Sequence, residues 1–219
     1  MSFEKVNWED IGIASLDTLS MLGGALFFTV LIGLPLGILL FLLGRQQLLH
    51  QPVLYGILSF VLNILRSVPF IILLIVLMPL TVVITGTSLG VRGVIPPLVI
   101  GTASFFARLV ETALREVDRG VIEASQAMGA STRQIVFRAL LPEALPGLIA
   151  AITVTSIVLV DYTAMSGAIG GGGIGDLAIR YGYQRFQTEI MIVTVALLVL
   201  LVQLLQAVGN LLVTKFTKK

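Results

Sequence analysis

Stretches without charged side chains divide this chain into candidate membrane helices. The runs at residues 18–44, 67–91 and 190–214 contain no charged residue, and each exceeds the about 20 apolar residues that a helix needs to span a bilayer core. The runs at 93–107 and 144–160 reach that length with their apolar flanks. The pattern predicts five membrane-spanning helices, at about 19–43, 55–79, 94–112, 144–165 and 189–213.

The second of these helices has the least regular pattern. Arg66 and Pro69 interrupt its apolar run, and proline lacks the N–H group that a helix interior needs. A span that begins nearer Ser67 is therefore the alternative to a helix over 55–79.

Composition agrees with a membrane protein. Hydrophobic residues make up 57% of the 219 residues and charged residues only 12%, whereas about a quarter of a soluble domain is charged. The mean hydropathy is +1.03. This excludes a soluble, disordered or coiled-coil protein, and the net charge of +2 is too small for a nucleic-acid binder. The predicted fold class is an all-α membrane protein.

Basic residues are distributed unequally between the two sides of the predicted bundle. Cytoplasmic loops carry an excess of Lys and Arg. One side holds nine basic residues and the other holds four, with Arg66 left uncounted. We therefore place the N-terminus outside, the C-terminus in the cytoplasm and the loop 113–143 on the cytoplasmic side. The nine are Arg45, Arg108, Arg115, Arg119, Arg133, Arg138, Lys215, Lys218 and Lys219; the four are Lys5, Arg92, Arg180 and Arg185.

The loop 113–143 has the pattern of two short helices. Asp118 is a helix-capping residue type, and Gly129 suits the left-handed conformation that ends many helices. Ser131 followed by Gln134 matches a capping box, which predicts the start of a second helix. We expect Pro142 to end that helix.

An apolar strip runs along the first of these short helices. Val121, Ala124, Ala127 and Met128 recur at three- and four-residue spacings. One interpretation is a hairpin that lies on the lipid headgroups. The other is a docking element for a cytoplasmic partner, because small side chains allow close approach.

The residues of this loop resemble the Glu-Ala-Ala loop of ABC-importer permeases. The spacing fits throughout, although Ser125 replaces the third residue of the motif and Ala139 stands where isoleucine is usual. In that family the first helix of the loop seats in a groove of the ATP-binding subunit. The resemblance implies ATPase-coupling roles for Glu123, Ala124, Ser125, Gly129, Leu141 and Pro142.

The stretches 63–71, 162–167 and 170–173 resemble the methionine-import branch of these permeases. The resemblance implies the ABC type I importer permease fold, in one transmembrane permease domain over 1–219, in the bacterial plasma (inner) membrane. It also implies a homodimer of ten helices, two ATP-binding subunits and an extracytoplasmic substrate-binding protein. ATP and Mg would be bound by the partner ATPase, and this chain would carry no cofactor or metal.

Polar residues within the predicted spans are candidates for a pore or gate. Ser59, Asn63 and Arg66 share one helix face, and such a stripe should face the bundle interior or a water-filled path. The alternative is that Arg66 extends to the cytoplasmic headgroups. The further candidates are Asp161, Tyr162 and Met165, for which hydration of Asp161 at the interface and ordinary packing of Met165 are the alternatives.

Glycine patterns predict close packing rather than cofactor binding. Gly170, Gly172 and Gly175 form a G-x-G-x-x-G, but they follow an apolar helix rather than a strand, so we expect a flexible or close-packed turn. Gly33 and Gly37 form a G-x-x-x-G, which indicates close helix packing.

The last predicted helix carries a polar stripe of its own. Gln203, Gln206 and Asn210 lie near one face of that helix. Amide side chains in a membrane commonly bond across helices. We expect interhelical hydrogen bonds from this stripe.

The chain has no phosphate-binding G-x-x-x-x-G-K-[ST] motif, so any ATP must be bound by another chain. It has no cysteine and only one histidine, and its carboxylates are not clustered. The sequence therefore offers no group of residues that could form a catalytic site, which argues against an enzyme. The expected function is the permease subunit of an ATP-driven importer of methionine, in the L and also the D form, that works by alternating access. The alternatives are a permease for another amino acid or small solute, or an ion-coupled secondary transporter.

Overall fold

The computed structural model describes residues 7–45 and 47–217, and within them the chain is helical without a strand. Among these residues, four helices are long and apolar enough to cross a membrane, or five spans if a bent pair counts as one. This agrees with the predicted all-α membrane fold. The four are α1 (Trp8–Leu43), α4 (Gly90–Arg115), α8 (Leu145–Ser166) and α10 (Thr188–Phe216).

Helix α1 begins earlier than its apolar pattern predicted. Asn7 caps it, with its side chain accepting a hydrogen bond of 3.1 Å from the Glu9 N–H, and Asp10 also lies in the first turn. Acidic residues stabilise a helix N-terminus, so the charges that limit the apolar run do not limit the helix. The first turns of α1 therefore extend beyond the apolar span.

The second span is broken, and the prediction of one helix over 55–79 is wrong. Helix α2 (Pro52–Ser67) and helix α3 (Phe70–Thr85) meet at an angle of 107°. Pro69 excludes the helical conformation at Val68, which adopts extended backbone at φ −84° and ψ 126°. The break therefore lies at the proline that interrupts the sequence pattern.

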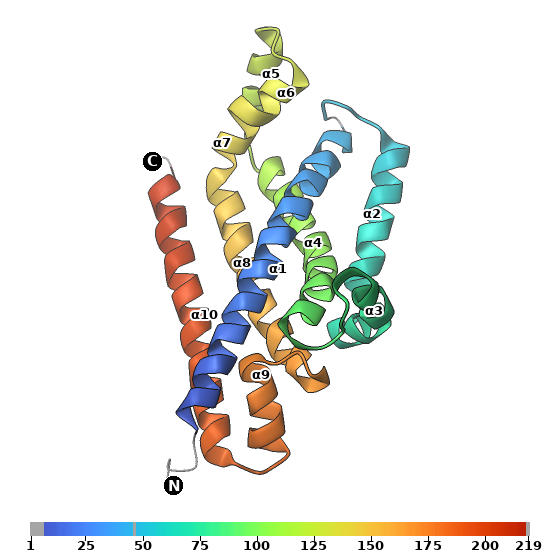
Figure 1. The fold of residues 1–219 in the computed structure, drawn as a ribbon. Coiled ribbons are helices and arrows are strands. Elements are labelled where there is room, and N and C mark those ends of the chain that lie inside the picture. The colour runs from blue at the N-terminus through green and yellow to red at the C-terminus, as the bar shows by residue number, and fades with distance from the viewer. Residues whose placement is uncertain (1–6, 46, 218–219) are drawn as a thin grey trace.

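Helices α1 and α4 cross in close contact at the centre of the bundle (Figure 1). A Cβ atom on Gly37 would lie 2.5 Å from the Val110 Cβ, and one on Gly33 would lie 2.8 Å from the Phe106 ring. One turn earlier, the hydroxyls of Thr29 and Thr102 share a buried hydrogen bond of 2.7 Å. The G-x-x-x-G prediction of close packing is confirmed, and α4 is the partner.

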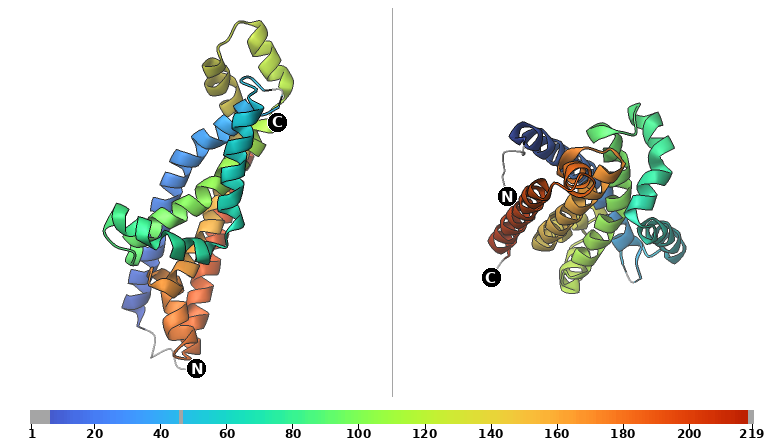
Figure 2. Two further views of the ribbon diagram at one scale, coloured as in Figure 1. Left: turned by 90° about the vertical axis from the view of Figure 1, so that its right-hand side faces the viewer. Right: turned by 90° about the horizontal axis from the view of Figure 1, so that it is seen from below.

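Helix α8 lies between α4 and α10, and both views in Figure 2 keep α10 beside α8. The contact is close at Gly209, where a Cβ atom would come within 2.3 Å of the Thr153 side chain. Among the described residues, the α10 stripe forms none of the predicted interhelical hydrogen bonds. The Gln206 side chain instead donates to the Asn210 side-chain oxygen one turn along the same helix, at 2.9 Å.

The glycine cluster forms a turn between α8 and α9 (Gly173–Leu177). Of the two predicted forms, flexible or close-packed, the structure shows the close-packed one. Gly170, Gly172 and Gly173 have φ of about +80° to +85°, a backbone conformation that residues with a Cβ atom rarely adopt. The Ile174 N–H donates to the Thr18 hydroxyl at 2.9 Å, so the turn is held against α1. A π-helical segment, Ala178–Tyr183, then leads to α10.

The segment between α4 and α8 forms a helical hairpin at the end of the molecule opposite α9 (Figure 1). It comprises α5 (Arg119–Ala127), α6 (Thr132–Ile135), a π-helical segment Val136–Leu140 and α7 (Leu141–Glu143). Its buried Ile122, Ile135 and Leu140 belong to the same apolar cluster as Phe41 of α1 and Leu114 of α4. The hairpin is therefore continuous with the packed core of the bundle.

The α1–α4 contact yields a stability prediction. Gly37→Ala places a Cβ atom 2.6 Å from the Ala107 carbonyl oxygen, so the helices must separate, and overpacking of this kind costs about 1–3 kcal/mol. Gly23→Ala on the same helix meets nothing within 4 Å and should be neutral or stabilising by up to about 1 kcal/mol. SDS unfolding in mixed micelles, followed by circular dichroism, measures both. Equal unfolding free energies for the two variants would contradict the packing described here.

Candidate functional site

The helical hairpin is built by the capping residues that its sequence predicts. The Asp118 carboxylate accepts a hydrogen bond of 2.6 Å from the Gly120 N–H, and α5 ends before Gly129, whose φ is +76°. Ser131 and Gln134 form the predicted capping box at the start of α6. These predictions are confirmed, and they give the hairpin a defined shape.

Pro142 does not end the second helix of the hairpin, so that prediction is wrong. Helical backbone continues through α7 to Glu143, and α8 begins at Leu145. A π turn precedes the proline, in which the Leu141 N–H donates to the Val136 carbonyl five residues earlier. The wider turn accommodates a residue without an N–H, which an α-helical turn would not.

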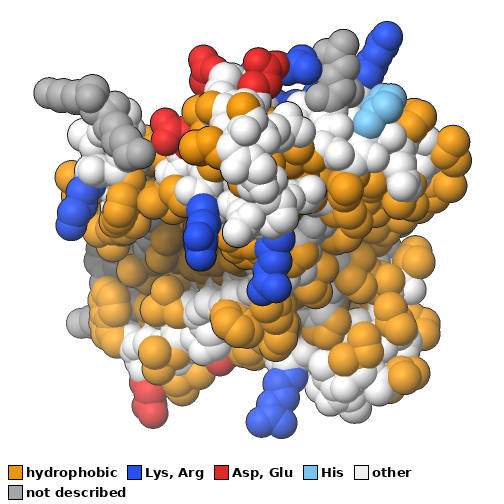
Figure 3. Space-filling view, turned by 90° about the horizontal axis from the view of Figure 1, so that it is seen from above, with side chains coloured by type: hydrophobic (Ala, Val, Ile, Leu, Met, Phe, Trp, Pro, Cys, Tyr) orange, Lys and Arg blue, Asp and Glu red, His pale blue; other side chains and the backbone are white. Residues whose placement is uncertain are grey.

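The outer surface of the hairpin is exposed and carries most of the predicted coupling residues. Ala124, Gly129 and Pro142 are exposed, as is Glu123, which pairs with Arg119 at 3.0 Å. Figure 3 views this end of the molecule and shows acidic, basic and apolar side chains together over it. A partner could therefore reach both charged and small apolar groups here.

Two of the predicted coupling residues face inward instead. The Ser125 hydroxyl donates to the Val121 carbonyl at 2.7 Å and is buried, and Leu141 is half-buried. A depression of about 400 Å³ lies between α5 and α6, where Ser125, Met128 and Gly129 line one side. Met128 is 81% exposed at its rim. Along the predicted apolar strip, Val121 is half-buried while Ala124 and Ala127 are exposed.

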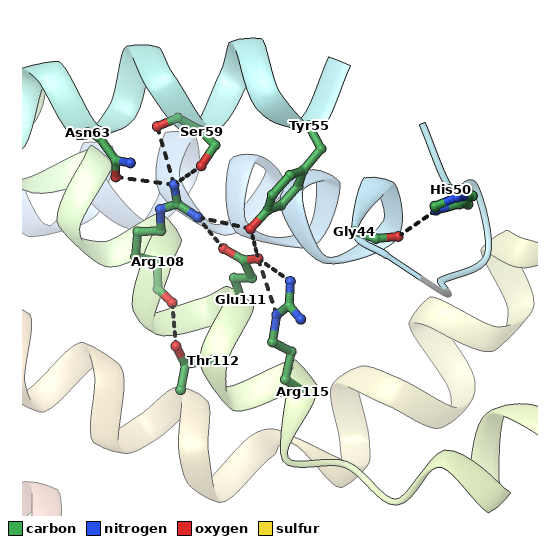
Figure 4. A network of polar contacts seen from close by, with 9 residues as sticks. All are labelled: Gly44, His50, Tyr55, Ser59, Asn63, Arg108, Glu111, Thr112 and Arg115. Carbon is green, nitrogen blue, oxygen red and sulfur yellow. Dashed lines mark hydrogen bonds and ion pairs between the residues drawn. The ribbon is translucent and has the colours of Figure 1, made fainter. Parts of the chain in front are cut away.

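A polar network joins α2 to the last turns of α4 (Figure 4). The Arg108 guanidinium donates to the Glu111 carboxylate at 2.8 Å, to the Asn63 side-chain oxygen at 3.2 Å and to the Ser59 hydroxyl. It also donates to the Ser59 carbonyl at 3.3 Å and to the Tyr55 hydroxyl at 3.5 Å. Ser59 and Asn63, predicted as pore candidates, thus hold α2 against α4.

Glu111 is the centre of this network and was not among the predicted site residues. Its side chain is 5% exposed and accepts hydrogen bonds from the Tyr55 hydroxyl at 3.0 Å and from the Arg115 Nη2 at 2.7 Å. Arg108 completes its surroundings, so two guanidinium groups neutralise one buried carboxylate. The available signal was the spacing of Arg108, Glu111 and Arg115, which puts all three on one helix face.

Arg66 lies apart from this network, at the break between α2 and α3. Its guanidinium is 5.7 Å from the centre of the Phe105 ring, and it lines a cavity together with Tyr162. The Tyr162 ring stacks on Phe70 with centroids 4.0 Å apart. The break lies at the opposite end of α2 from the end that follows α1 (Figure 1).

Asp161 and Met165 are exposed on the last turns of α8. Met165 is 47% exposed, and neither residue lines the cavity of Arg66 and Tyr162. The structure therefore divides the predicted pore residues into three places, with Arg66 and Tyr162 the pair that shares a cavity. Within the described part of the chain, no group of three or more acidic or histidine side chains could hold a metal ion.

Comparison with known families gives a match over most of the chain. The family described as binding-protein-dependent transport system inner membrane component matches residues 33–219. A probable D-methionine transport system permease protein, MetI of Vibrio cholerae, is 46% identical over 194 residues, 89% of this chain and 85% of that protein. The methionine import system permease protein MetP of Bacillus subtilis is 45% identical over 181 residues, 83% of this chain and 82% of that protein.

Solved structures give the same result for the fold. A chain from the MetNI methionine ABC transporter in an inward-facing conformation superposes with a TM-score of 0.95 at 46% identity, over 100% of both chains. A chain of an amino acid ABC transporter superposes with a TM-score of 0.76 at 18% identity, over 94% of both chains. The second likeness concerns the fold alone.

The network around Glu111 yields a second prediction. Glu111→Gln removes the buried carboxylate that pairs with the partly buried Arg108 and the exposed Arg115, so we expect a loss of about 1–3 kcal/mol in the free energy of unfolding. Glu123→Gln removes an exposed ion pair and should change it by less than about 1 kcal/mol. SDS titration in mixed micelles compares the two. A Glu111→Gln variant as stable as Glu123→Gln would show that the network contributes nothing.

Proposed function

This chain belongs to the family of binding-protein-dependent transport system inner membrane components, and from that premise we propose that it is the membrane-spanning permease subunit of an ATP-driven methionine importer. The observation that carries the proposal is its superposition over the full chain on a permease chain of a methionine ABC transporter. The substrate would be L-methionine and also D-methionine, since curated relatives are described for D-methionine transport. The chain would lie in the inner membrane with its N-terminus outside and its C-terminus in the cytoplasm.

We propose that the assembly contains two copies of this chain, two ATP-binding subunits and an extracytoplasmic substrate-binding protein. The absence of a phosphate-binding loop motif supports a separate ATPase, which would bind ATP and Mg. The permease itself would then carry out no covalent chemistry. The described part of the chain has at most five spans, which supports a path formed between two copies.

The hairpin of α5 to α7 would couple ATP hydrolysis to the membrane helices. Its exposed residues Glu123, Ala124 and Gly129 would contact the ATPase, while its buried Ile122 and Ile135 pack into the core that includes α1 and α4. Packed cores transmit displacements because they have little free volume. Movement of the hairpin with a closing ATPase would rock the helices and open the path alternately outward and inward.

Reconstituted uptake tests this function against its rivals. Proteoliposomes that contain the permease, its ATPase and the substrate-binding protein should accumulate labelled methionine only when ATP is supplied to the ATPase side. A proton or sodium gradient without ATP should give no uptake. Uptake driven by the gradient alone would identify a secondary transporter, and ATP-driven uptake of a different solute in place of methionine would identify another substrate.

The coupling role of the hairpin gives a further prediction. Ala124→Trp adds a bulky side chain on an exposed surface, so it should leave the fold intact while reducing the co-purified ATPase by about tenfold, the effect of roughly 1.4 kcal/mol. Ala168→Trp is a matched control, because Ala168 is exposed in the turn that precedes α9 at the opposite end. Affinity purification in mild detergent measures the ratio of the two chains. A stoichiometric ATPase with Ala124→Trp would exclude this surface from the contact.

A further inference from the structure

A cavity lies at the break between α2 and α3, and it is open to the surface at Arg66, which is exposed. Its volume is about 170 Å³, and α4 and α8 close its other sides. Non-helical backbone within a membrane is tolerated where it is covered by protein or lines a polar cavity, and broken spans recur at substrate sites of transporters. The residues around it include Arg66, Val68, Phe70, Leu73, Phe105 and Tyr162.

Arg66 supplies a cation to this cavity. Its guanidinium has a ring contact with Phe105, but within the described part of the chain it forms no ion pair with any carboxylate. Asp161, the neighbour of Tyr162 in sequence, lies outside ion-pair distance. An arginine within a membrane protein normally pairs with an anion, and its planar fork matches a carboxylate. Arg66 is exposed at the mouth of this cavity, so its guanidinium is accessible to an anionic group that comes from outside this chain.

Three aromatic rings line this cavity beside aliphatic side chains. Phe70 and Tyr162 stack with an angle of 7° between their planes, and Phe105 lies beneath Arg66. Gly101 adds no side chain, and a Cβ atom there would already lie 3.4 Å from the Phe70 ring and the Leu73 side chain. Thioether sulfur makes favourable contacts with aromatic rings. The cavity thus places a carboxylate-binding group next to surfaces suited to an apolar, sulfur-containing side chain.

We propose that this cavity is a subsite for the amino acid on its way through the membrane, with the substrate carboxylate on Arg66 and its thioether chain against Phe105 and Tyr162. The inference rests on the proposed function, because it takes methionine as the transported solute. It adds a site in the permease itself that selects a carboxylate attached to an apolar side chain. Neither the coupling hairpin nor the network around Glu111 contributes to this site.

Photolabelling tests the subsite directly. The probe is photo-methionine, an L-methionine analogue with a diazirine in place of the sulfur, added to the permease–ATPase complex in nanodiscs without nucleotide. After irradiation, peptide mapping should place the label within 65–73 or at Phe105 or Tyr162. Excess L-methionine should abolish the labelling. L-methioninamide, which lacks the carboxylate charge, should compete about tenfold less well, as expected for loss of a charge-assisted hydrogen bond.

Variants separate the role of Arg66 from a general effect of charge. Arg66→Gln should reduce labelling about tenfold or more, while Arg92→Gln, an arginine of α4 that lines a different groove, should leave it unchanged. Gly101→Leu should fill the cavity and also abolish the labelling. Both Arg66→Gln and Gly101→Leu complexes should keep ATP hydrolysis stimulated by the binding protein while their methionine uptake falls.

Three outcomes would overturn the subsite: a label that maps elsewhere, wild-type labelling of an assembled Arg66→Gln complex, or wild-type labelling of Gly101→Leu. The last variant decides the matter if Arg66→Gln does not assemble. Failure of the proposed function is distinguishable, because a wild-type complex would then show no ATP-driven methionine uptake at all. A complex that imports methionine without labelling the cavity would refute the subsite and leave the function intact.

Discussion

The close approach of α1 to α4 determines the arrangement of the other helices. Gly33 and Gly37 remove the side chains that would keep the two axes apart, and a buried hydrogen bond between threonines secures the crossing. Hydrophobic burial drives helix association only weakly in lipid, so packing of this kind must supply much of the attraction. Helix α4 then holds α2 through Arg108 and packs against α8, while the start of α1 holds the glycine turn before α9.

This arrangement connects the two ends of the molecule. The hairpin that follows α4 is packed into the same apolar cluster as α1, α4 and α8. The ion network around Glu111 lies just before the hairpin and ties α2 to the same helix. The hairpin and the broken span are thus connected through the side-chain contacts of α4.

Local features of the hairpin were predictable because capping acts over a few residues. Asp118, Gly129 and the Ser131–Gln134 box each satisfy backbone groups within one turn, and each lies where its pattern placed it. The effect of Pro142 was not predictable in this way. Whether a proline ends a helix depends on whether the preceding turn can widen, and here the π turn of Val136–Leu140 provides that room.

The sequence by itself determined the membrane class, the four unbroken spans, the proline that interrupts the second span and the resemblance to the family. These depend on hydrophobicity, proline and motif spacing, all of which act along the chain. The tertiary structure alone decided the angle of the break, the pairing of Ser59 and Asn63 with Arg108, and the meeting of Arg66 with Tyr162. Contacts of this kind depend on the rotation and separation of helices that are distant in sequence, and no local pattern encodes either quantity.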